Sequence, residues 1–80
     1  MKLSTLKEIE KLLVHNVEDK ELMYKKAGEK VVDLEYAQAE EREDFSIDEL
    51  KYWEKTKMKH WQKMCSAKEA LQDFLEHDWN

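Results

Sequence analysis

Apolar residues recur along the chain at the alternating three- and four-residue steps of helices that pack on one another. Over residues 17–44 the seam that forms in this way is Val17, Tyr24, Ala27, Val31, Leu34 and Gln38. Over residues 47–78 a second seam is Leu50, Trp53, Lys57, His60, Met64, Ala67, Leu71 and Phe74. Because the sequence contains no proline, the pattern predicts two long helices.

The residues from Phe45 to Leu50 carry the signals of a helix start directly after the first long segment must stop. Ser46 can accept a hydrogen bond from the backbone N–H of Glu49, and the Glu49 side chain can reach back to the N–H of Ser46. Phe45 can pack on Leu50 across the first turn as a hydrophobic staple. The two long helices are therefore predicted to form an antiparallel hairpin around this corner.

A shorter apolar stripe near the N-terminus predicts a helix over residues 5–15, with Ser4 or Thr5 as its cap. The apolar positions of this stripe are Leu6, Ile9 and Leu13. Asn16 followed by Asp19 has the spacing of a capping box, which predicts a break before the first long helix. We expect the short helix to pack across the hairpin. Two alternatives are that it docks on a partner and orders only there, or that it is continuous with the next helix.

Several apolar residues fall outside the first seam and give that helix more than one apolar face. They are Leu22, Met23, Val32 and Tyr36. A thin hairpin with one short extra helix cannot cover all of them, so a second copy of the chain is expected to cover part. The sequence therefore predicts a homodimer that packs as a four- or six-helix bundle.

Two polar residues, Lys57 and His60, interrupt the second seam. Antiparallel pairing around the hinge places Lys57 opposite Leu34. Polar seam residues often set helix register or oligomeric state; the alternative is that this layer is partly open and contacts a ligand or partner. Gly28 costs about 1 kcal/mol in a helix interior relative to alanine, and we expect it to leave a notch that Trp61 fills.

Composition agrees with a single all-α domain over residues 1–80. The chain is 41% apolar and 41% charged, with no proline and one glycine, which argues against a disordered chain and against a β fold with many tight turns. A net charge of −5 disfavours general binding to nucleic acid or to an anionic membrane. The single cysteine, the absence of a signal-peptide pattern and the short apolar runs lead us to expect a cytoplasmic protein.

Acidic residues gather around the predicted corner. We call this group the acidic tip, which consists of Glu40, Glu41, Glu43, Asp44 and Asp48. Concentrated negative charge can steer a basic protein surface toward a binding site. The alternative reading is that these side chains serve solubility and favourable charge at a helix start.

Lysines follow the corner at four-residue spacing. We call Lys51, Lys55, Lys59 and Lys63 the lysine stripe. Together with the aromatic side chain of Trp61 they suggest a nucleic-acid-binding face, since lysine neutralises phosphate and an indole ring can stack on bases. The alternative is that tryptophan packs in the core and the lysines face solvent.

No set of residues predicts catalysis or a metal site. Asp73 and His77 lie four residues apart on one helix face, but they lack a third ligand. Cys65 and His60 lack a carboxylate that would orient the histidine as a base. Glu40, Glu41 and Asp44, before the hinge, could supply part of a Mg²⁺ site, but such a site needs a second acidic motif on the facing helix. The facing helix offers lysines instead. We therefore expect no enzyme activity, no metal and no cofactor.

The sequence as a whole predicts a small acidic protein-interaction module. We expect it to regulate or inhibit a larger assembly by binding another protein, in the manner of small proteins of phages and other mobile elements. The alternative is a nucleic-acid-binding helical protein that uses the lysine stripe and Trp61.

Overall fold

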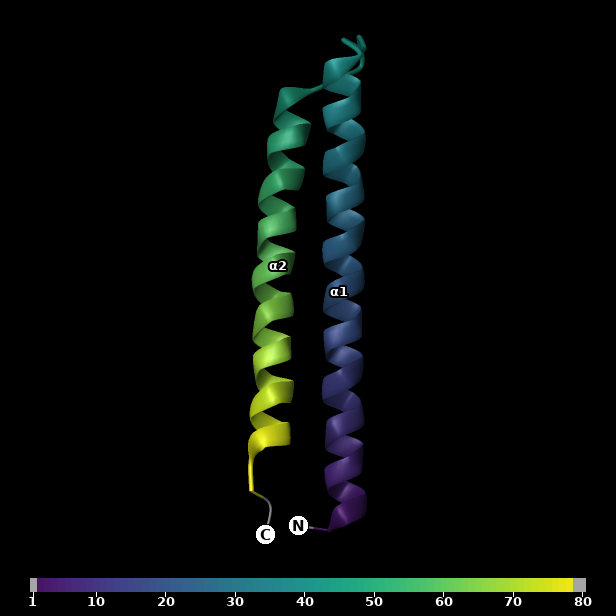
Figure 1. Cartoon of the computed structure of the whole chain (residues 1–80). Helices are drawn as coiled ribbons and strands as arrows, with labels where there is room; N and C mark the ends of the chain where they lie inside the picture. Colours follow the sequence, from purple (N-terminus) through teal and green to yellow (C-terminus); the bar gives the residue numbers. More distant parts are fainter. Residues whose placement is uncertain (1, 79–80) are drawn as a thin grey trace.

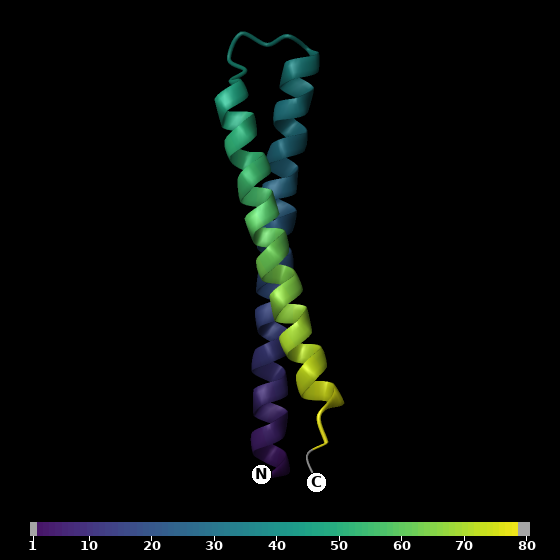
Figure 2. The same cartoon turned by 90° about the vertical axis from the view of Figure 1, so that its left-hand side faces the viewer.

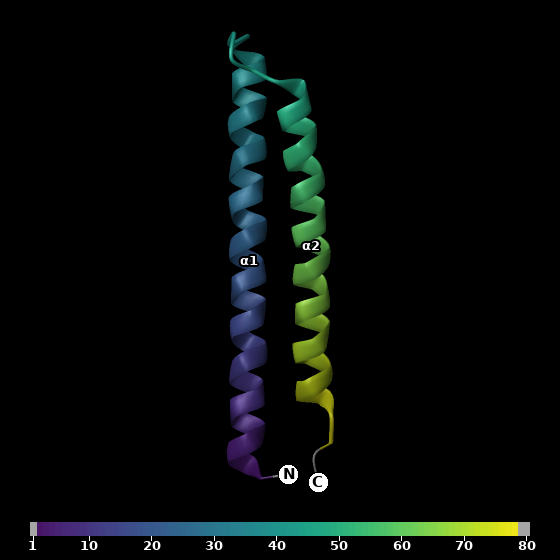
Figure 3. The ribbon, with the colours of Figure 1, turned by 180° about the vertical axis from the view of Figure 1, so that it is seen from behind.

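The computed structural model describes residues 2–78 and consists of two antiparallel helices joined by a short corner (Figure 1). Helix α1 spans Leu3–Ala39 and helix α2 spans Ile47–Glu76. The helices lie side by side along their length, with the corner at one end and the start of α1 and the end of α2 at the other (Figures 1 and 3). The predicted all-α hairpin is therefore confirmed.

The hairpin is a rod of 61 × 15 × 14 Å. Its radius of gyration is 18.1 Å, against about 12 Å for a compact domain of this length. From the side, α2 crosses in front of α1 at a shallow angle (Figure 2), as ridges-into-grooves packing of nearly antiparallel helices requires. A rod of two helices has no interior except the seam between them.

The buried residues among 2–78 all lie in or beside this seam: Val17, Ala27, Val31, Ala37, Leu50 and Ala67. The predicted seam is confirmed with one exception, since its other members are all at least partly buried. Gln38 is exposed, and its neighbour Ala37 occupies the seam instead. Alanine at such positions lets the two backbones approach closely, while the larger side chains pack beside them.

The predicted break between the short helix at 5–15 and the next helix is wrong, because α1 is continuous through this region. Val17 lies four residues after Leu13 on the same stripe, and continuous helix keeps both against α2. Asn16 is exposed on the helix surface. Since no proline or glycine forces a stop here, packing of the stripe outweighs the capping preference of a single asparagine.

Without a third helix, nothing in the described chain covers the apolar residues outside the seam. The exposed residues of this kind on α1 include Leu22, Met23, Val32 and Tyr36. On α2 they include Ile47, Met58, Trp61 and Leu75. The hairpin therefore leaves much more apolar surface in water than the sequence alone led us to expect.

Helix α1 ends at Ala39, earlier than the predicted residue 44, in a Schellman motif. The Glu41 N–H donates to the Gln38 carbonyl at 3.1 Å, and the Arg42 N–H donates to the Ala37 carbonyl at 3.1 Å. Glu41 has a φ of 53°, the left-handed conformation that glycine usually supplies at this position. The helix end was missed because glutamate gives no stop signal in the sequence.

Helix α2 begins as predicted, with Ser46 as its cap. The Glu49 N–H donates to Ser46 Oγ at 3.3 Å, and Asp48 and Glu49 place negative charge in the first turn, which the helix dipole favours. The helix ends at Glu76, two residues before the predicted end.

Replacing Ser46 by alanine removes the cap without changing the seam, so we expect the free energy of unfolding to fall by about 1 kcal/mol. Urea unfolding followed by circular dichroism measures this loss. Ser66→Ala is the matched control, because Ser66 is exposed in the middle of α2, where alanine is the better helix former. Equal losses for the two substitutions would contradict the assigned cap.

Replacing Glu41 by glycine should raise the free energy of unfolding by about 0.5–1 kcal/mol. The left-handed conformation costs a residue with a Cβ about 1–2 kcal/mol, and the greater freedom of glycine in the unfolded chain offsets part of that gain. Glu43→Gly removes the same charge from the same corner at a residue without positive φ. The control should be neutral or destabilising, and a gain there equal to that at Glu41 would instead indicate a charge effect.

Candidate functional site

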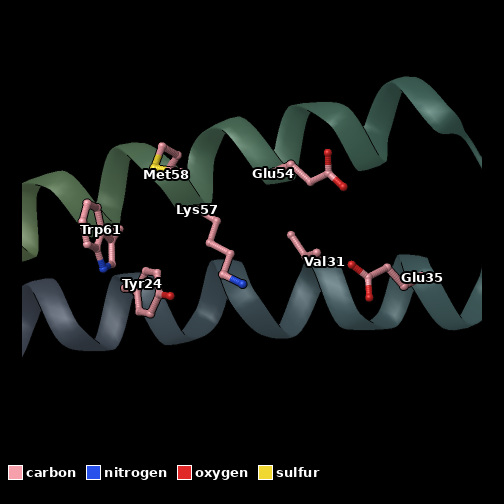
Figure 4. Close-up of a pocket in the computed structure, with 7 residues that line it drawn as sticks. All are labelled: Tyr24, Val31, Glu35, Glu54, Lys57, Met58 and Trp61. Carbon is pink, nitrogen blue, oxygen red and sulfur yellow. The ribbon is translucent and has the colours of Figure 1, made fainter.

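One long side of the hairpin carries an open groove between the helices, with a volume of about 440 Å³. We call it the aromatic groove, and it is lined by Tyr24, Val31, Glu35, Glu54, Lys57, Met58 and Trp61 (Figure 4). Trp61 extends from α2 toward Tyr24 on α1, while the two carboxylates lie farther along the groove, toward the corner. The sequence did not predict that these side chains share one surface.

Lys57 extends across the seam inside this groove. Its Cε lies 3.7 Å from the position that a Cβ on Gly28 would occupy, and its Nζ lies 5.8 Å from the centre of the Tyr24 ring. The aliphatic part of the side chain therefore packs on α1, while the ammonium group interacts with the face of an aromatic ring. His60, the other polar seam residue, is partly buried one turn farther along α2.

The predicted partner of Lys57 and the predicted occupant of the Gly28 notch are both wrong. Lys57 lies against Gly28 and Tyr24, not opposite Leu34, and it fills the notch expected for Trp61. The reason is the early end of α1, which lengthens the corner, so Lys57 lies beside a residue of α1 six positions before the predicted one, which is more than one helical turn.

An ion pair links the two helices on the side of Lys57 away from the corner. Lys68 Nζ lies 3.2 Å from Glu21 Oε1, and both side chains are half exposed. A pair of this kind adds less than about 1 kcal/mol of stability.

The lysine stripe and Trp61 do not form one surface. A second hollow, of about 450 Å³, is lined by Lys59 and Lys63 together with Asn16 and Lys20, whereas Trp61 lines the aromatic groove. Helix geometry accounts for the separation, because Trp61 is two residues from both Lys59 and Lys63, and side chains two residues apart point in directions about 160° apart. The four lysines of the stripe are exposed, but they lack the aromatic partner that the sequence suggested.

The acidic tip lies in the corner and the first turn of α2, and all five of its residues are exposed. Arg42 contacts Glu40 through Nη2 at 2.6 Å and Nε at 2.7 Å. Over residues 2–78 this is the one ion pair that involves the tip. The tip therefore presents a concentrated negative charge at the end of the rod, as the sequence predicted.

No metal site is found in the part of the chain that the structure describes, where no three potential ligand side chains converge. Cys65 is a partly buried thiol. In this same part, neither helix has a stretch long and apolar enough to cross a bilayer.

Comparison with known proteins gives no significant match to a family model, to a curated protein or to a solved structure. The function must therefore be argued from the surfaces of the hairpin.

Replacing Gly28 by alanine should raise the free energy of unfolding by about 1 kcal/mol. Alanine is the better residue in a helix interior, and its Cβ would make an ordinary van der Waals contact at 3.7 Å with Lys57 Cε. Thermal unfolding followed by circular dichroism measures the change. A loss of stability would mean that Lys57 and α1 lie closer together than this distance.

Proposed function

We propose that this protein regulates or inhibits a larger assembly by binding another protein through its acidic tip. We further propose that it does so in the cytoplasm and as a homodimer, in the manner of small regulatory proteins of phages and other mobile elements. The observation that carries the proposal is the group of five exposed carboxylates at the end of the rod, apart from the aromatic groove and from the exposed lysine stripe.

The acidic tip suits contact with a basic protein surface. Its carboxylates are exposed at the end of a long rod, and one arginine pairs with one of them. Exposed charges of one sign raise the rate at which an oppositely charged partner associates, and this effect weakens with added salt. A rod end that is narrow and charged can also enter a recess in a larger partner.

Binding to nucleic acid is the second candidate function, and the exposed lysine stripe favours it. Four lysines at four-residue spacing can follow a phosphate backbone. Trp61 lies away from this stripe, so Tyr52, which is 61% exposed and lies on the same helix face as Lys59 and Lys63, is the ring that remains for stacking on single strands. The negative charge of the whole chain opposes this function.

Reversing the charge of the tip tests the proposal. We expect Glu40, Glu41 and Glu43 changed to lysine to lose the partner that wild-type protein captures from its native host, with unchanged helical content. The matched control reverses Glu8, Asp19 and Glu69, which are exposed acids on the helices, and should retain the partner. Once the partner is purified, association with wild type should slow as salt rises.

The same capture experiment separates the two candidate functions. A variant with Lys51, Lys55, Lys59 and Lys63 changed to glutamate should still bind the protein partner. The proposal fails if the tip variant captures the partner as well as wild type does. The second candidate replaces it if wild type retards DNA or RNA at micromolar concentration and physiological salt, and the lysine variant does not.

A further inference from the structure

The side of the hairpin that holds the aromatic groove carries aromatic and aliphatic side chains that extend beyond the groove, with charged residues between them. A hollow next to the groove shares Tyr24 and Lys57 with it and extends to Val32. Another hollow on this same side contains Val32, which lines the hollow next to the groove, and Glu35, which lines the groove itself. It extends to Tyr36. We call this surface the apolar face and define it by Tyr24, Val32, Tyr36, Met58 and Trp61.

The apolar face is well exposed for side chains of this size. Val32 is 47% exposed, Tyr36 63%, Met58 56% and Trp61 46%. The opposite side of the hairpin is different, since its hollow is lined mainly by lysine, amide, serine and alanine side chains. One side of the rod therefore has the character of an interface and the other has the character of an outer surface.

The exposed area of the chain indicates how much surface a partner must cover. The hairpin exposes 6547 Å², whereas a compact monomer of the same mass, 9.7 kDa, exposes about 5100 Å². The excess of roughly 1400 Å² exceeds the ~800 Å² that each partner buries in an interface of standard size. The elongated rod therefore exposes enough surface for an interface of standard size with a second copy.

We infer that two copies pack through the apolar face in antiparallel orientation and form a four-helix bundle with the two acidic tips at opposite ends. The inference rests on the proposed homodimer and adds to it the contacting face and the orientation. A symmetric dimer of this kind brings the same face of both copies together around a two-fold axis. Trp61, Met58 and Tyr36 would then supply the apolar centre of the interface.

Charge along the apolar face favours the antiparallel orientation. Asp33, Glu35 and Glu54 line it nearer the corner, whereas Lys25 and Lys57 line it farther from the corner, with one acid, Glu29, among them. A two-fold axis perpendicular to the rod at the level of Lys30 places Glu35 of one copy level with Lys25 of the other. A parallel dimer would instead place like charges opposite each other and bring the two acidic tips together, which costs association energy.

The orientation has a consequence for function. Tips at opposite ends of the bundle cannot contact the same small site, so each dimer would bind two partner molecules. A parallel dimer would present both tips to one molecule.

The first part of the test measures oligomeric state by light scattering at tens of micromolar. We expect wild type to have the mass of a dimer. Val32→Glu combined with Trp61→Glu should give a helical monomer, because both side chains are exposed in the single hairpin and their replacement leaves its seam intact. Leu12→Glu, an exposed residue outside the apolar face, should remain a dimer.

The second part of the test measures orientation with single-cysteine variants in a Cys65→Ser background. Two variants are prepared, Lys25→Cys and Glu35→Cys, and one carries a longer tag so that the cross-linked products differ in size. They are mixed until their subunits have exchanged, and a short bis-maleimide cross-linker is then added. We expect the product that joins the two different variants to dominate. Lys59→Cys, on the opposite side, should give little product.

Each other outcome overturns a defined part of the account. Products that join Lys25→Cys to itself and Glu35→Cys to itself would mean a parallel dimer. A dimer that survives the double glutamate substitution, or that cross-links mainly through Lys59→Cys, would mean that another face is used. A wild-type monomer would overturn both this inference and the proposed homodimer, and it would leave binding through the acidic tip to be decided by the charge-reversal experiment.

Discussion

The structure depends on a single interface, the seam between α1 and α2. Each helix has only one neighbour, so it can bury only the stripe that faces that neighbour. The buried residues are small or medium in size, with alanine at Ala27, Ala37 and Ala67, and they let the helices approach while larger rings lie at the sides. The exposed aromatic and aliphatic side chains are therefore a consequence of a two-helix fold, and some of them, including Val32, Tyr36, Met58 and Trp61, lie on one side.

Lys57 illustrates how such a seam tolerates a polar residue. Its stem packs on α1 next to Gly28, and its ammonium group reaches the Tyr24 ring at the open edge of the seam. In a thicker fold the same lysine would be cut off from water at a large energetic cost. In the single hairpin the ammonium group lies at an open edge of the seam, and the residue can contribute to register without being buried.

The sequence predicted the class of fold, the corner and most of the seam, because each rests on strong local signals: helical periodicity, the Ser46 cap and the absence of proline. It failed where a weaker local preference competed with packing. Asn16 resembled a cap, but the stripe from Leu13 to Val17 continues the helix. Glu41 ends α1 in the left-handed conformation, which a glutamate in the sequence does not indicate. The resulting shift in helix pairing could therefore not be predicted. The grouping of Tyr24, Met58 and Trp61 depends on that shifted register, so periodicity within one helix could not reveal it.

The central claim is that a second copy of the chain covers the exposed apolar side, and the dependence of thermal unfolding on protein concentration tests it most directly. If folding and dimer formation are coupled, the unfolding midpoint must rise by mass action as concentration rises, by several degrees between about 2 and about 200 μM. Circular dichroism at both ends of this range is sufficient to measure the shift. A midpoint that stays constant over the whole range would contradict the account, because it would mean that no second copy of the chain dissociates when the hairpin unfolds.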